Sequence, residues 1–107
     1  PTSAKQEDQV SMATFAARRL QPMIANVAHI LGIELMAAAE GIEFLRPLSS
    51  SAPLEAAHQL LRERVPRFAQ DRFMAPDIER ASALVRAGTL AKAFRAIPGL
   101  PALWIAV

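Results

Sequence analysis

The sequence predicts an all-α fold in which one long N-terminal helix is followed by three shorter helices. Residues 9–40 contain Gly32 and Pro22 but are otherwise dominated by alanine, leucine, methionine, isoleucine, arginine and glutamate, which favour helix. In the later segments, apolar residues recur at helical spacing, and no stretch shows the strict alternation or hairpin turns typical of strands. We therefore expect a single helical unit across residues 1–107.

The long helix is predicted over residues 9–40, with Gly41 ending it. On a helical wheel its polar side chains occupy less than half of the circumference, and a helix of this kind is expected to be buried over most of its surface. The polar stripe comprises Ser11, Thr14, Arg18, Gln21, Asn26, His29 and Glu40, and the apolar seam opposite comprises Leu20, Ile24, Val27, Leu31 and Ala38, flanked by Met23, Ile30 and Leu35.

The predicted long helix is too large for a 107-residue domain to cover alone. About 30 residues extend roughly 45 Å as a helix, whereas a compact domain of this size is roughly 34 Å across. The chain is also 52% hydrophobic and only 21% charged. Because the first residue is Pro1 and not methionine, we expect a piece of a longer protein or a self-assembling chain, in which other subunits or another part of the same protein cover the helix.

The remaining elements follow from their terminal signals. Residues 1–8 are expected to form a loop, and the shorter helices are expected at 53–66, 76–87 and 90–97, followed by an apolar tail over 98–107. Ser51 is expected to cap the second helix, with Pro53 in its first turn. Asp77 falls in the first turn of the third helix, where the helix dipole favours a negative charge, and Gly88 ends that helix.

Composition excludes several classes of function. The chain has no cysteine, which removes disulfides, thiolate catalysis and cysteine-bound zinc, and its formal charge is only +2 without a clustered basic face for nucleic acid. No signal peptide is visible, and the most apolar window, 23–39, is interrupted by polar residues, so no membrane span is expected. His29 and His58 have no partner at metal-ligand spacing, so we expect both to be ordinary surface or edge residues and expect no metal site.

Candidate chemistry begins with the polar cluster Gln6, Glu7 and Asp8, just before the long helix. Carboxylates at a helix start commonly serve only the helix dipole, at about 0.3–1 kcal/mol each, and the alternative is that Gln6 and Glu7 line a polar pocket. Glu34 lies on the apolar side of the long helix, where we expect an ion pair with an arginine from a neighbouring helix or subunit.

The segment SAKQEDQVSMATFAARRL resembles the SANQEDHVSM segment of histidine ammonia-lyases, in the aromatic amino-acid ammonia-lyase family. The resemblance continues through IELMAAAEGIEFLRPL, SAPLEAAHQLLRERVP and DRFMAPDIERASALVRAG, and so covers the chain from Thr2 to about Leu90. It implies a fragment of an ammonia-lyase-type helical bundle, from a cytoplasmic homotetramer whose active sites draw residues from several subunits. The implied reaction removes ammonia from histidine to give urocanate.

The family's electrophile is a methylidene-imidazolone group that forms from an internal Ala-Ser-Gly. The chain's four glycines are preceded by Leu31, Glu40, Ala87 and Pro98, so it contains no Ser-Gly pair and cannot make this group. The resemblance therefore places the chain in the C-terminal part of such a lyase, inactive alone, with the electrophile expected in the full-length enzyme.

By position, Glu7 matches the glutamate of the family's QED motif, which implies a catalytic and substrate-binding role, and Gln6 would be its neighbour in the pocket. Two positions depart from the motif: Lys5 stands where the family has asparagine, and Gln9 stands where it usually has histidine. The alternative hypothesis is a stand-alone helical module for oligomerisation or interaction, without catalysis.

Overall fold

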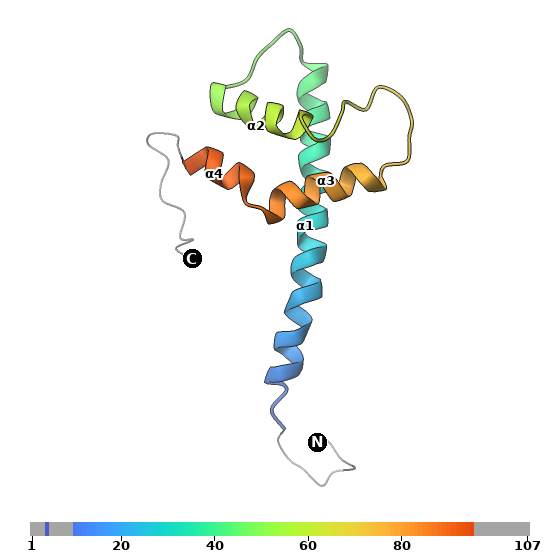
Figure 1. Cartoon of the computed structure of the whole chain (residues 1–107), viewed down its shortest axis with the longest axis vertical. Helices are drawn as coiled ribbons and strands as arrows, with labels where there is room; N and C mark the ends of the chain where they lie inside the picture. Colours follow the sequence, from blue (N-terminus) through green and yellow to red (C-terminus); the bar gives the residue numbers. More distant parts are fainter. Residues whose placement is uncertain (1–3, 5–9, 96–107) are drawn as a thin grey trace.

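The structure, a computed structural model, describes residue 4 and residues 10–95, and within this part of the chain all regular structure is helical apart from turns. Helix α1 spans Ala13–Phe44, α2 spans Ala52–Arg62, α3 spans Ala75–Arg86 and α4 spans Thr89–Arg95. The three shorter helices gather around the C-terminal half of α1, and the N-terminal half projects beyond them (Figure 1). The predicted class and the order of one long helix and three shorter helices are confirmed.

The bounds of α1 differ from the prediction at both ends. The helix begins at Ala13 and continues through Pro22 and past Gly41 to Phe44. A glycine ends a helix by adopting a left-handed conformation, and in this chain Gly88 has a positive φ of 63° whereas Gly41 does not. The prediction that Gly41 ends the helix is therefore wrong, and α1 stops instead just before Pro47, whose ring disfavours a helical residue at the preceding position.

Two helices approach each other closely where α1 crosses α3. A Cβ atom built on Gly32 would lie 2.9 Å from the backbone nitrogen of Ser82 and 3.3 Å from the carbonyl carbon of Ala81. Ser82 and Ala81 are fully buried at this crossing. A glycine is required because only the absence of a side chain lets the two backbones come this near.

The core is small and lies on the same side of α1 as this crossing. Leu61 and Val65, from α2 and the turn after it, are buried against α3, and Leu35 and Met36 of α1 pack on this cluster. The residues that α1 itself buries are small ones: Ala28, Gly32 and Ala39.

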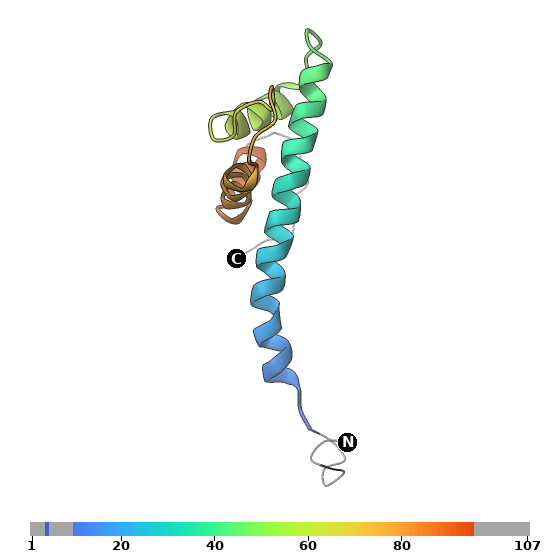
Figure 2. The same cartoon turned by 90° about the vertical axis from the view of Figure 1, so that its right-hand side faces the viewer.

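Among the described residues, α2, α3 and α4 all lie along one side of α1 and leave its opposite side uncovered (Figure 2). The predicted apolar seam lies on this uncovered surface: Leu20 is 55% exposed, Ile24 is 63% exposed and Val27 is 51% exposed. The radius of gyration is 19.7 Å, against about 13 Å for a compact chain of about this length. The prediction that the chain cannot cover its own long helix is confirmed.

By length and composition alone, α1 is long and apolar enough to cross a membrane. Its covered face, however, carries polar contacts at mid-helix, including an ion pair between His29 and Glu79 of α3. A helix with one polar, protein-covered face and one apolar, bare face is typical of a bundle helix that has further helical neighbours.

Replacing Gly32 by alanine is expected to lower the free energy of unfolding by about 1–3 kcal/mol, because the new methyl group forces α1 and α3 apart. This loss outweighs the roughly 1 kcal/mol by which alanine is favoured over glycine in a helix. The matched control is Gly41→Ala, where a Cβ meets nothing within 4 Å and only the stabilising helix preference remains. Urea unfolding followed by circular dichroism measures both variants, and equal stabilisation of the two would contradict the close crossing.

Candidate functional site

The predicted site residues Gln6 and Glu7 lie outside the described residues, as do the two motif departures, Lys5 and Gln9, and the predicted apolar tail 98–107. Their roles therefore stay predictions. What the structure describes is the helix that follows them in the sequence, and a set of ionic clusters that fix the shorter helices to it.

The largest ionic cluster surrounds Glu40, near the C-terminal end of α1. Its carboxylate accepts hydrogen bonds from Arg62 Nη2 at 2.8 Å, Arg67 Nε at 3.2 Å and the backbone N–H of Phe68 at 3.2 Å. Partial burial would raise the pKa of Glu40, but the Phe68 N–H and the two arginines outweigh it and hold the pKa below its usual 4.5. Glu40 thus ties both α2 and the segment after it to α1.

A second cluster joins the end of α1 to the start of α2. Arg46 donates to both carboxylate oxygens of Glu55, at 3.0 and 2.8 Å, and the backbone N–H of Ser50 donates to Glu55 at 2.7 Å. The Arg46 guanidinium, followed by the Ser50 N–H, lowers the pKa of Glu55 to about 2. Ser51 occupies the N-cap position as predicted, but its side chain makes no capping hydrogen bond.

His58 of α2 is more enclosed than its sequence position suggests. Its side chain is only 9% exposed, and Nε2 lies 3.0 Å from Oε1 of Glu43, which also contacts Arg62. The expectation of an ordinary surface or edge residue is therefore wrong for His58. No local signal in the sequence could have shown this, because Glu43 belongs to another helix, α1.

Asp77 was expected to serve the dipole of the third helix, but it is buried, with 3% exposure. Its two oxygens accept from Arg72 Nε at 2.8 Å and Arg80 Nη1 at 2.7 Å. Arg72 also donates to the carbonyl oxygens of Arg67 and Pro66, so it holds the segment between α2 and α3 in place. The buried carboxylate of Asp77 thus holds this segment against α3 through its ion pair with Arg72.

His29 and Glu79 make the polar contact between α1 and α3. Nε2 of His29 lies 2.9 Å from Oε1 of Glu79, and Nδ1 lies 2.9 Å from the carbonyl oxygen of Ala25. The hydrogen bond from His29 holds the pKa of Glu79 below its usual 4.5. Both side chains are at least a third exposed, as expected for a residue at the edge of the polar stripe.

Glu34, Arg18 and Arg19 differ from Glu40 and Glu43, the other charged residues of α1. All three are exposed, and none forms an ion pair with any residue that the structure describes. Arg19 lies over the ring of Phe15, 5.9 Å from its centroid. The arginine partner that we expected for Glu34 is thus not among residues 10–95 of this chain.

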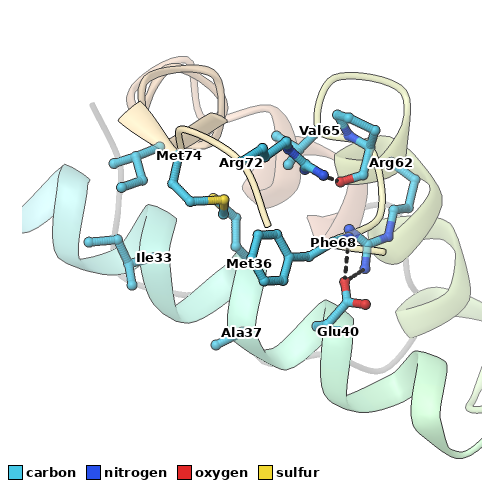
Figure 3. A pocket seen from close by; sticks show the side chains of 11 residues that line it. Ile33, Met36, Ala37, Glu40, Arg62, Val65, Phe68, Arg72 and Met74 are labelled. Atoms are coloured by element: carbon cyan, nitrogen blue, oxygen red, sulfur yellow. Dashed lines mark hydrogen bonds and ion pairs between the residues drawn. The ribbon is translucent and has the colours of Figure 1, made fainter. Parts of the chain in front are cut away.

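A cavity of about 310 Å³ opens between α1, α3 and the segment that joins α2 to α3. Its walls are mostly apolar, with Met36, Phe68 and Met74 facing one another across it (Figure 3). The charged residues at its edge are already paired, Glu40 with Arg62 and Arg72 with Asp77. The cavity can accept an apolar group, but it presents no free acid or base.

The described residues therefore hold no complete catalytic arrangement, and no group of three or more histidine, aspartate or glutamate side chains among them could hold a metal ion. The carboxylates that form ion pairs among them hold helices and the segments between helices together, which is a structural role. The predicted catalytic residues precede α1 and lie outside the described part of the chain.

Comparison with known proteins gives a consistent result. The model of the aromatic amino acid lyase family matches residues 1–63. The chain is 64% identical over 91 residues to a histidine ammonia-lyase of Roseobacter denitrificans and 60% identical over 88 residues to one of Rhodospirillum rubrum, covering 85% and 82% of this chain. It spans only 18% and 17% of the length of those relatives.

A solved structure shares the fold. The crystal structure of histidine ammonia-lyase from Trypanosoma cruzi superposes with a TM-score of 0.78 at 40% sequence identity. The match covers 88% of this chain and 19% of that one.

The acid stability of the chain should depend on Glu55. Its pKa of about 2 lies below the ordinary 4.5, so its ionised form stabilises the folded chain above pH 4.5, and this contribution is lost as the pH falls towards 2. We expect Glu55→Gln to lower stability at neutral pH and to flatten the loss of stability between these pH values. The measurement is urea unfolding across the pH range.

Glu63→Gln is the matched control for this experiment, because Glu63 is exposed and forms no ion pair with the described residues. It should keep the pH dependence of the parent chain. An unchanged acid limb in Glu55→Gln would contradict the role given to the Arg46–Glu55 pair.

Proposed function

The chain belongs to the aromatic amino acid lyase family, and we propose that it is the C-terminal segment of an ammonia-lyase that deaminates histidine to urocanate. The observation that carries the proposal is the family match over residues 1–63, which includes the QED motif, together with the high identity to proteins named histidine ammonia-lyase. In this proposal the segment supplies pocket residues from its N-terminal motif and a core helix from α1.

Glu7 is assigned the catalytic and substrate-binding role, with Gln6 beside it. A carboxylate suits histidine because it accepts a hydrogen bond from an imidazole N–H, and this bond strengthens when the ring becomes positively charged. A phenyl ring offers no such donor, so a glutamate at this position favours histidine over phenylalanine as the substrate. Lys5 lies two positions before Glu7 in the sequence. The role proposed for the Glu7 carboxylate must therefore be compatible with a positive charge at that position.

The electrophile of the family has no precursor in this chain, because none of its glycines follows a serine. The segment therefore cannot supply the residues from which the electrophile forms, and no reaction step on the electrophile is assigned to it. We propose that it is inactive alone and that the methylidene-imidazolone group forms elsewhere in the enzyme.

The bare face of α1 supports the proposal that the segment functions inside a homotetramer, and the cytoplasmic location is proposed from the family resemblance alone. Large apolar side chains that are half exposed along one helix mark a surface that another protein surface covers. A stand-alone oligomerisation module would use the same face, and it remains the second candidate because the described residues hold no catalytic arrangement.

Glu7→Gln, made in a lyase that contains this segment, is expected to lower urocanate formation from histidine by about 100-fold or more, the range for loss of a general acid–base group. The matched control is Asp8→Asn, which removes the neighbouring carboxylate and should keep most of the activity. Ultraviolet absorbance of urocanate gives the rates, and an unchanged oligomeric mass shows that assembly is intact. Unchanged turnover in Glu7→Gln would reject the assigned role, and a module without catalysis would form no urocanate in any version.

A further inference from the structure

The two ring nitrogens of His29 both face hydrogen-bond acceptors. Nδ1 lies 2.9 Å from the carbonyl oxygen of Ala25, one turn earlier on α1, and Nε2 lies 2.9 Å from Oε1 of Glu79 on α3. A carbonyl oxygen and an ionised carboxylate only accept hydrogen bonds, whereas a neutral imidazole has one donor nitrogen and one acceptor nitrogen. Both contacts are therefore hydrogen bonds only when His29 carries a proton on each nitrogen, and hence a positive charge.

His29 is the member of this cluster whose charge changes near neutral pH. The hydrogen bond from His29 holds the pKa of Glu79 below its usual 4.5, so the carboxylate stays ionised between about pH 5 and 8, where imidazole titrates. The other charged group that contacts Glu79 in the described part of the chain is Arg86 of α3, whose Nη2 lies 3.7 Å from Oε2 of Glu79. An arginine keeps its charge throughout this range.

The contact between His29 and Glu79 lies where it can act on the packing of α3. His29 precedes Gly32 by three residues, and Glu79 precedes Ser82 by three, so the pair lies about one helical turn from the close crossing of α1 and α3 (Figure 1). It is also the only ion pair between α1 and α3 among the residues that the structure describes. The ionic attachment of α3 to α1 thus depends on one imidazole.

The attachment of α2 to α1 does not depend on a histidine in the same way. Glu43 of α1 lies 3.0 Å from Nε2 of His58, but it also lies 3.4 Å from Nε of Arg62. Glu40 of α1 contacts Arg62 as well, at 2.8 Å. Because Arg62 keeps its charge, α2 stays paired with α1 when both histidines are neutral, and a rise in pH acts selectively on α3.

We propose that His29 and Glu79 form a pH-sensitive link that holds α3 on α1 while His29 is charged and weakens when its imidazole becomes neutral. In the neutral ring one nitrogen presents a lone pair to an acceptor, so one of the two contacts turns repulsive, and the ionic attraction to Glu79 is lost. The link is therefore strongest below the pH range in which imidazole titrates, and it weakens as the pH rises through that range.

The neutral state leaves the Glu79 carboxylate with Arg86, which belongs to the same helix and does not attach α3 to α1. The link thus exchanges a contact between two helices for a contact within one. This inference goes beyond the proposed function and does not depend on it, because every contact that carries it lies within this chain.

A double-mutant cycle of His29→Gln and Glu79→Gln tests the link, with urea unfolding at about pH 5 and about pH 8 and at one protein concentration. At the lower pH we expect a coupling of about two- to fivefold in the folding equilibrium constant, the range for exposed ion pairs. At the higher pH the coupling should fall towards onefold. The cycle cancels the titration of His58, which is the same in all four proteins, and circular dichroism checks that the exposed substitutions spare the fold.

His29→Arg is the matched control, because an arginine stays positively charged at both pH values. In a cycle that starts from His29→Arg, the coupling with Glu79 should be the same at the two pH values. A cycle of Glu79→Gln with Arg86→Gln should also show no fall as the pH rises. Equal coupling of His29 and Glu79 at both pH values, or no coupling at the lower one, would overturn the proposal.

Discussion

The architecture depends on one close approach, the crossing of α1 and α3 at Gly32. The 2.9 Å between a would-be Cβ and the Ser82 nitrogen leaves no room for any side chain at this point. Because α3 is fixed there, α2 and the segment after it must lie on the same side, where Glu40 and Asp77 receive their arginines. The chain thus packs its own shorter helices against the side of α1 that carries small and polar residues. The larger apolar side chains are left on the other side.

This division gives α1 two unlike halves as well as two unlike faces. The C-terminal half is held by partly buried charge pairs and by the small core around Leu61. The N-terminal half, from Ala13 to about Val27, buries none of its own side chains and leads back in the sequence to the QED motif. In the proposed function, another protein surface covers this half of α1. That is the arrangement we expect where active sites draw on several subunits.

The helices and their order were predictable because local preference and periodicity decide them, and the over-long α1 followed from length and composition alone. The side of α1 on which α3 would pack was not predictable. Burial of apolar area favours the Leu20–Leu31 side, but the chain uses the side on which Gly32 permits close contact. Gly41 does not end α1, because a glycine ends a helix by adopting a left-handed backbone conformation and Gly41 does not adopt one. The burial of His58 and Asp77 depends on arginines and carboxylates distant in sequence, and the roles of Gln6 and Glu7 stay predictions that rest on the motif.

The central claim is that the N-terminal half of α1 needs cover from outside the chain, and hydrogen exchange of its backbone amides tests this most directly. With mass spectrometry at increasing protein concentration, we expect the amides of residues 13–27 to exchange rapidly in dilute solution and to become protected as copies associate. Amides of residues 28–44 should be protected throughout, because α2 and α3 cover them. Strong protection of residues 13–27 at the lowest concentration, where the chain is a monomer, would contradict the account.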